Sequence, residues 1–211
     1  EVPGNLQMDS VYLVDSGGQY LDGTTDITRT VSVGNPSEYI KKTFTLVLKG
    51  HIALASAQFP DGIAGQHLDT FARQYLWHEG LDFDHGTGHG VGCYLNVHEG
   101  PHGIGKGANH VPLQENMVVS NEPGYYRENE FGIRIENLIY VKKIKDVDGK
   151  KLLGFENLTF VPLDIRLLDM RILTNIEKDW INSYHETVLK KVAPHVEGPV
   201  LEWLENAVQA I

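Results

Sequence analysis

The spacing of apolar and polar residues predicts a pair of β-strands near the start of the chain. Residues 11–15 (VYLVD) form an apolar run typical of a buried strand, and residues 27–33 (ITRTVSV) are rich in β-branched side chains. Gly-Gly and Asp-Gly pairs lie between the two runs and favour a reversal of the chain. We therefore expect one hairpin, with Asp15 and Asp26 on adjacent strands.

A period of three to four residues then predicts two helices. Apolar residues recur at helical spacing in the segment 40–52, which predicts a helix with one buried face, an N-cap at Ser37 and an end before residues 59–62. A second apolar stripe covers residues 68–76, and Gly80 is its expected stop. Both helices are interpreted as packing elements.

The middle of the chain predicts a loop followed by a second pair of strands. The glycine- and histidine-rich segment 100–112 lacks periodicity and is expected to run over the surface. Residues 117–122 and 132–141 predict two strands, with Pro123-Gly124 as the turn signal between them. Each of the two predicted hairpins would thus carry two carboxylates.

The C-terminal segment predicts helices. Residues 174–177 (TNIE) have the form of a capping box, in which the threonine and the glutamate satisfy each other's free backbone N–H groups. Trp180 lies in the helix after this box, and Trp203 lies in a last predicted helix. These tryptophans pack in the core or, alternatively, form a subunit contact, because buried aromatic residues are common in both.

Composition indicates an ordinary globular protein and argues against some partners. The chain has 211 residues, 41% hydrophobic and 22% charged, enough for one large domain or one and a half small ones. It carries 28 acidic against 18 basic residues, a formal charge of -10 that repels phosphate backbones and anionic lipid. We expect no nucleic-acid partner and, since no apolar run approaches a membrane span, no membrane partner.

The single cysteine bears on the cellular compartment. Cys93 cannot form an intrachain disulfide, and no secretory segment is visible, which favours the cytoplasm. The glycosylation sequon at residues 157–159 (NLT) points the other way, and we interpret it as a chance match.

Five side chains are candidate metal ligands. They are Asp15, Asp26, His89, Glu122 and Glu136. Four converging carboxylates repel one another by about 4 kcal/mol per pair at ~4 Å and an effective dielectric constant near 20, and two divalent cations would remove that cost. Oxygen ligands with one imidazole suit manganese, cobalt, iron or zinc, and a pair of such ions can activate water for hydrolysis. On spacing alone, scattered surface acids remain the alternative.

The sequence around these residues resembles the aminopeptidase P and prolidase group of peptidase family M24, most nearly the three-domain aminopeptidase P enzymes. The resemblance rests on five short motifs that run through most of the chain: VDSG, TDITRT, HGTGHGVG, NEPGYY and GIRIEN. It implies an α+β pita-bread fold, a curved antiparallel sheet flanked by helices. Residues 1–165 would form the catalytic domain, and residues 166–211 a helical extension.

The resemblance also implies a role for each ligand. Asp15 would bind one metal ion, His89 and Glu122 would bind the other, and Asp26 and Glu136 would bridge both. The expected ions are two Mn²⁺, with Co²⁺, Fe²⁺ or Zn²⁺ as alternatives. Glu122 would also help to activate the bridging hydroxide.

Three further residues are expected to serve this site. His85 and His98 resemble histidines that line the substrate pocket near the scissile bond, although each is by itself equally compatible with a structural histidine. Because side chains alternate along a strand, Arg134 should share a face with Glu136 and could orient a ligand carboxylate. A simple surface ion pair is the alternative for Arg134.

The resemblance implies a metalloaminopeptidase that releases the N-terminal residue from peptides with proline in second position, acting in the cytoplasm as a homodimer. A prolidase, which cleaves only dipeptides, and a non-catalytic binding protein on the same fold are the alternatives. Family members carry another pocket histidine upstream of the first metal ligand, whereas residues 1–14 contain none. We therefore expect a chain truncated at its N-terminus that binds metal poorly or is inactive in isolation.

Two other motifs are rejected as functional sites. Residues 98–102 (HEGPH) match the zinc-protease pattern, which requires both histidines on one helix face, and Gly100-Pro101 would break that helix. The glycines of residues 86–92 do not fit a phosphate-binding pattern, because valine stands where G-x-G-x-x-G requires glycine. We expect these glycines to let the backbone approach the metal site closely.

Overall fold

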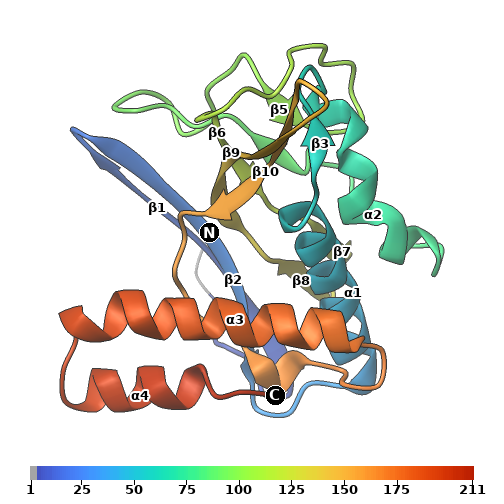
Figure 1. Cartoon of the computed structure of the whole chain (residues 1–211). Coiled ribbons are helices and arrows are strands. Elements are labelled where there is room, and N and C mark those ends of the chain that lie inside the picture. The colour runs from blue at the N-terminus through green and yellow to red at the C-terminus, as the bar shows by residue number, and fades with distance from the viewer. Residues whose placement is uncertain (1–3) are drawn as a thin grey trace.

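The computed structural model describes residues 4–211, so the first three residues of the predicted domain 1–165 lie outside the described part. The chain folds into curved antiparallel β-structure flanked by helices, which confirms the expected α+β pita-bread class (Figure 1). The elements in order are β1 (Ser10–Tyr20), β2 (Gly23–Val33), α1 (Glu38–Ala55), β3 (Phe59–Pro60), η1 (Gly65–His67), α2 (Asp69–Trp77), β4 (Gly88–His89), β5 (Gly103–Ile104), β6 (Val118–Asn121), β7 (Gly124–Arg127), β8 (Phe131–Arg134), β9 (Asn137–Val147), β10 (Lys150–Asn157), η2 (Ile165–Leu167), α3 (Asn175–Val192), η3 (Ala193–His195) and α4 (Pro199–Ala207).

The first hairpin is a long ribbon of β1 and β2, drawn in blue in Figure 1. The two strands pair antiparallel over their whole length, so the predicted hairpin is confirmed. The prediction that residues 11–15 are buried is wrong, because Tyr12 is 45% exposed and Val14 is 36% exposed. Tyr12 and Val14 lie on the face of the ribbon opposite Asp15, and within residues 4–211 the part of that face at these two side chains stays partly open to solvent.

Helix α1 lies at the centre of the fold. The Ser37 hydroxyl accepts a hydrogen bond from the Ile40 N–H at 3.3 Å, which confirms the predicted N-cap. The expectation of one buried face is wrong, because α1 is buried on nearly all sides between Thr43 and Leu54. Its packing against α2, α3 and the strands leaves little of α1 open to solvent. Helix α2 ends at Trp77, three residues before the predicted stop.

The second hairpin is longer and more bent than predicted. Strands β6 and β9 pair and join β10 and β3 in one sheet, while β7 and β8 continue the same hairpin. The chain reverses at residues 128–130 and not at Pro123-Gly124, and the predicted strand 132–141 is broken between Arg134 and Asn137. The break arises because the N–H of Glu136 donates to Thr28 O on the ribbon, at 3.0 Å, instead of across the hairpin.

The C-terminal helices pack on the same hydrophobic core as α1. The capping box at the start of α3 is confirmed, with the Thr174 and Glu177 side chains and backbones bonded reciprocally. Trp180 stacks on Tyr184 with 5.3 Å between ring centroids, whereas Trp203 is 59% exposed. Because one core serves both parts, the division into residues 1–165 and 166–211 stays a prediction.

The segment 100–112 is only partly the surface loop that was predicted. Strand β5 lies in it and pairs with β4, and the Ile104 side chain is buried at 1% exposure. This pairing fixes β4, which carries His89, in a position next to β6. Over residues 4–211, none of the helices combines the length and apolar character that crossing a bilayer requires.

Candidate metal centre

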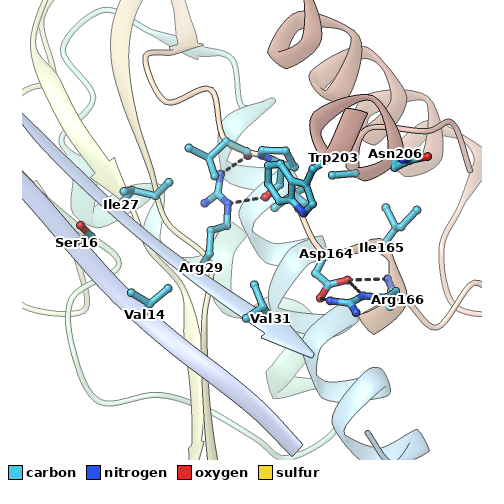
Figure 2. A pocket seen from close by; sticks show the side chains of 14 residues that line it. Val14, Ser16, Ile27, Arg29, Val31, Asp164, Ile165, Arg166, Trp203 and Asn206 are labelled. Atoms are coloured by element: carbon cyan, nitrogen blue, oxygen red, sulfur yellow. Dashed lines mark hydrogen bonds and ion pairs between the residues drawn. The ribbon is translucent and has the colours of Figure 1, made fainter. Parts of the chain in front are cut away.

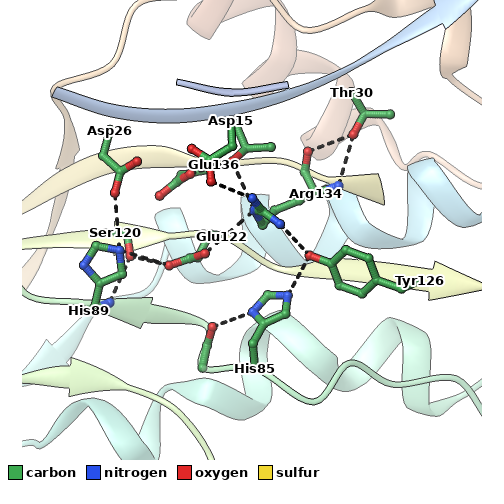
Figure 3. A network of polar contacts seen from close by, with 12 residues as sticks. Asp15, Asp26, Thr30, His85, His89, Ser120, Glu122, Tyr126, Arg134 and Glu136 are labelled. Atoms are coloured by element: carbon green, nitrogen blue, oxygen red, sulfur yellow. Dashed lines mark hydrogen bonds and ion pairs between the residues drawn. The ribbon is translucent and has the colours of Figure 1, made fainter. Parts of the chain in front are cut away.

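The five candidate ligands meet in one cavity of about 400 Å³. The cavity lies between the inner face of the β1–β2 ribbon and the bend of the second hairpin, and it also contains His98. Figure 3 shows carboxylates from the ribbon facing His89 and Glu122 from the opposite side. Residues separated by more than a hundred positions in sequence are thus brought together.

The register of the ribbon places the two aspartates on one face. Asp15 pairs with Thr28, and Gly17 pairs with Asp26, so Asp15, Asp26 and Thr28 point to the same side. The Asp26 side chain is 9% exposed and the Asp15 side chain is 51% exposed. Asp15 therefore stands at the mouth of the cavity, and Asp26 stands deeper in it.

His89 is held by two close backbone approaches. A Cβ at Gly88 would overlap the carbonyl oxygen of Ser120, and a Cβ at Gly90 would overlap that of Glu99, which confirms the expected role of these glycines. The His89 N–H donates to Ser120 Oγ at 2.9 Å, and ring Nδ1 donates to Gly90 O at 2.9 Å. Nε2 is thereby left facing the cavity, with its lone pair available in the neutral ring.

The two glutamates are oriented by hydroxyl groups. Ser120 Oγ donates to Glu122 Oε1 at 2.9 Å, and Thr28 Oγ1 donates to Glu136 Oε2 at 2.7 Å. Glu136 is 2% exposed and Thr28 is fully buried. Each glutamate sits where a strand of the second hairpin ends, because the backbone there bonds outside the hairpin: Glu122 N–H donates to Thr87 O at 2.8 Å, and Glu136 N–H donates to Thr28 O at 3.0 Å.

The donor atoms form overlapping groups. Asp15, Asp26 and Glu136 offer oxygens that all lie within 4.8 Å of one another, and so do the donors of His89, Glu122 and Glu136. Asp26 connects the two groups, since its Oδ2 lies 3.4 Å from His89 Nε2. The arrangement has the form of two neighbouring sub-sites that share Glu136.

The electrostatics of the cluster reveal an excess of negative charge. Burial, together with the charges of Glu122 and Asp26, raises the pKa of Glu136 to about 8. Burial opposes the protonation of His89, but the adjacent Asp26 and Glu122 carboxylates raise the pKa of His89 to about 10. Without cations the cluster would hold protons at neutral pH, so its preferred occupant is positively charged.

The donor set fits two divalent ions. Four carboxylates carry four negative charges, which equal the charge of two such ions, and a donor set of carboxylates with imidazole and no thiolate suits oxygen-preferring divalent ions. A third donor group, formed by Asp26, His89 and His98, also lies within 4.8 Å. The rings of His89 and His98 are 4.1 Å apart between centroids, so His98 borders the same space.

A second polar chain runs from the cavity to His85. Arg134 Nη2 bonds Asp15 Oδ2 at 2.7 Å, and Arg134 Nη1 donates to Tyr126 Oη at 2.9 Å. Tyr126 Oη in turn lies 2.8 Å from His85 Nε2 (Figure 3). Arg134 therefore contacts a candidate ligand carboxylate and also the residue that links it to His85.

The zinc-protease pattern at residues 98–102 is not a metal motif in this fold. The segment is not helical, and the Gly100-Pro101 peptide is cis. His102 Nε2 bonds the Val118 carbonyl at 2.7 Å, away from the ring of His98. The rejection of this motif is confirmed.

Sequence reasoning missed three residues that the structure adds to the site. Thr28 and Ser120 orient the glutamates, and Tyr126 bridges Arg134 and His85. Tyr126 had one available signal: on strand β7 it alternates with Tyr125, which points into the core with 9% exposure. No pattern in the sequence marks the Thr28 hydroxyl, because its partner Glu136 is distant along the chain, whereas Ser120 lies two positions before Glu122, the spacing at which side chains share one face of a strand.

Two family models match the chain. Residues 2–143 match the model of metallopeptidase family M24, and residues 151–211 match the model of the C-terminal region of M24 peptidases. Aminopeptidase P2 of Arabidopsis thaliana is 54% identical over 201 residues, which cover 93% of this chain and 28% of that protein. The chain spans about a third or less of the length of the curated relatives that it matches.

The chain is also similar to solved structures of an X-prolyl aminopeptidase and of a prolidase. The X-prolyl aminopeptidase of Caenorhabditis elegans, a cytosolic enzyme with a di-nuclear active site, matches with a TM-score of 0.89 and 48% identity, over 95% of this chain and 33% of its own. The prolidase of Pyrococcus horikoshii matches with a TM-score of 0.63 and 32% identity, over 77% of this chain and 43% of its own.

Proposed function

Because the chain belongs to metallopeptidase family M24, we propose that its cavity holds two divalent metal ions and hydrolyses peptide bonds. Asp15 would bind one ion, His89 and Glu122 the other, and Asp26 and Glu136 would bridge both. The two overlapping donor groups support this division, since Glu136 belongs to each of them. When bound, the two ions would supply a nucleophile at neutral pH by lowering the pKa of water toward 7.

Side chains of the cavity would orient the peptide and transfer the proton of the nucleophile to the leaving amine. Glu122 has one carboxylate oxygen fixed by Ser120, at 2.9 Å, and its other oxygen lies 3.9 Å from Arg134 Nε. We propose that Glu122 would accept the proton of the nucleophile and return it to the leaving amine, a role that its fixed orientation supports. His85 and His98 would contact the peptide on either side of the ligands, and Arg134 would hold the Asp15 carboxylate in place.

The proposed substrate is a peptide with proline in second position, from which the N-terminal residue is released. The observation that carries this proposal is the C. elegans match, because it extends over 95% of the chain with a TM-score of 0.89. The match to the P. horikoshii prolidase covers less of the chain at a lower TM-score. We propose Mn²⁺ as the metal, the cytosol as the location and a homodimer as the assembly.

Two peptides distinguish an aminopeptidase from a prolidase. The protein at its full natural length, loaded with Mn²⁺, should cleave an Xaa-Pro-Yaa tripeptide, and the Asp26→Asn and Glu136→Gln variants should not. Cleavage of an Xaa-Pro dipeptide alone would establish a prolidase. Failure to bind metal, measured by elemental analysis after Mn²⁺ loading, would instead support a non-catalytic binding protein.

A further inference from the structure

Arg29 is a buried guanidinium that has no carboxylate partner. Its residue is 6% exposed, and over residues 4–211 no acidic oxygen lies within ion-pair distance of it. All of its hydrogen bonds run to neutral oxygens. The acceptors are Pro162 O (3.1 Å), Thr28 O (2.9 Å), Glu136 O (2.6 Å), Asn137 Oδ1 (2.7 Å), Val161 O (2.8 Å) and Tyr184 Oη (2.9 Å).

On one side, the Arg29 guanidinium donates hydrogen bonds to the backbone around Glu136. It donates to the Glu136 carbonyl and also to the Thr28 carbonyl, and the latter accepts the Glu136 N–H at 3.0 Å. The Thr28 hydroxyl then holds the Glu136 carboxylate at 2.7 Å. Every polar group of this shared candidate ligand is therefore bonded by Thr28 or Arg29, apart from the single oxygen left toward the cavity.

On the other side, Arg29 contacts the C-terminal part of the chain. Figure 2 shows the Arg29 side chain extending from β2. Its guanidinium donates to the carbonyl oxygens of Val161 and Pro162, in the segment before η2. Tyr184 of α3 accepts a further hydrogen bond, and the Tyr184 hydroxyl itself donates to Val161 O at 2.8 Å. The same side chain thus connects α3 with the backbone of Glu136.

We propose that Arg29 is a positioning residue for the metal centre, which sets the Glu136 carboxylate against Thr28 and makes its position depend on the packing of α3. The inference rests on the proposed metal site. Lysine cannot replace the planar fork of arginine, because a single ammonium group cannot reach six acceptors in fixed directions. The fixed positive charge also lies next to the ligand that both proposed ions would share.

The test compares two buried cations that both contact the α3 region. Arg29→Lys keeps the positive charge but loses the planar guanidinium and most of its hydrogen-bond donors. Lys49→Met is the matched control, because Lys49 is 7% exposed and bonds Glu177 at 2.7 Å and Ile172 O at 3.0 Å, neither of which is a candidate ligand. Tyr184→Phe removes only the hydroxyl, which bonds Arg29 and also Val161 and Thr159, and it serves if Arg29→Lys does not fold. Each variant is made in the full-length protein, and its Tm and Mn²⁺ affinity are measured by calorimetry.

We expect Arg29→Lys to bind Mn²⁺ about 10- to 100-fold more weakly, the usual range for loss of a residue that orients a metal ligand. Its activity should rise with added Mn²⁺, whereas Lys49→Met should lose Tm without a change in metal affinity. Tyr184→Phe should also weaken Mn²⁺ binding, by less than Arg29→Lys does, because it leaves the other hydrogen bonds of Arg29 in place. Unchanged Mn²⁺ affinity in a folded Arg29→Lys variant would overturn the proposal; if that variant does not fold, unchanged affinity in Tyr184→Phe would do so. A loss of Mn²⁺ affinity in Lys49→Met as large as that in Arg29→Lys would also overturn it.

Failure of the proposed function gives a different pattern. Wild-type protein that binds Mn²⁺ but cleaves no Xaa-Pro-Yaa peptide would refute the aminopeptidase. The Mn²⁺ affinities of the variants would still decide the role of Arg29, because they require no turnover.

Discussion

Replacement of Gly88 by alanine should damage the metal centre through a single methyl group. An added Cβ at Gly88 would overlap the carbonyl oxygen of Ser120 on strand β6. Backbone on both sides of this contact is ordered: β4 pairs with β5, and Gly90 bridges to Val119. Neither strand can move without breaking hydrogen bonds, so the methyl group cannot be accommodated by a side-chain rotation.

The expected cost follows from this geometry. Inserting a methyl into a well-packed site costs about 1–3 kcal/mol, and contact with backbone places Gly88→Ala toward the upper end of that range. Separation of β4 from β6 would also lengthen the bond from His89 N–H to Ser120 Oγ, the atom that orients Glu122. Metal affinity should therefore fall together with the free energy of unfolding.

Gly86 provides the matched control within the same segment. A Cβ at Gly86 would meet only Ile104 O at 3.5 Å, an ordinary van der Waals contact. Urea unfolding should show Gly86→Ala within about 0.5 kcal/mol of wild type, the usual range for tolerated substitutions, and Gly88→Ala well below it. Equal stability and equal Mn²⁺ binding for the two variants would refute the reasoning about close backbone approach.

Three further predictions concern hydroxyl groups and buried histidines. Thr28→Val removes the donor to Glu136 at nearly constant volume and should weaken Mn²⁺ binding by about tenfold or more in calorimetry; unaltered affinity would contradict the orienting role. Tyr126→Phe breaks the link between Arg134 and His85, and it should lower kcat while the metal content by elemental analysis stays at the wild-type value. Burial lowers the pKa of His51 to about 3 and that of His185 to about 4, so below pH ~6.5 the unfolded chain gains protons that the folded chain does not. The contribution of these two histidines to stability should be full above pH ~6.5 and should be lost toward pH 4, by up to about 1.4 kcal/mol per pH unit for each histidine. Urea unfolding of His185→Gln should show a shallower loss between pH 6.5 and 5, and an unchanged slope would argue against this origin.

Local elements followed the sequence closely where the stabilising contacts are themselves local. The N-cap of α1 and the capping box of α3 join residues only three positions apart, and both form as predicted. The ribbon register likewise follows from a short connection between two adjacent strands. The burial of Tyr12 and Val14 did not follow, because exposure depends on what the rest of the molecule places against the outer face of β1.

The second hairpin marks the point where local reasoning failed. Pro123-Gly124 has the composition of a turn, yet the chain continues into β7 and turns at residues 128–130. Competing hydrogen bonds to the ribbon and to Thr87 decide where the strands break, and these partners are far away in sequence. The same breaks position Glu122 and Glu136, so the error in the strand boundaries concerns the site directly.

By itself, the sequence determined the identities of the candidate ligands, the α+β class and the family, since short motifs around each ligand carry that information. Only the tertiary structure decided that Thr28 and Tyr126 orient the site and that Arg29 joins α3 to Glu136. The physical reason is the range of the interactions. A ligand is recognised by its immediate neighbours in the chain, whereas a hydrogen bond between residues 41 to 155 positions apart leaves no periodic or local trace.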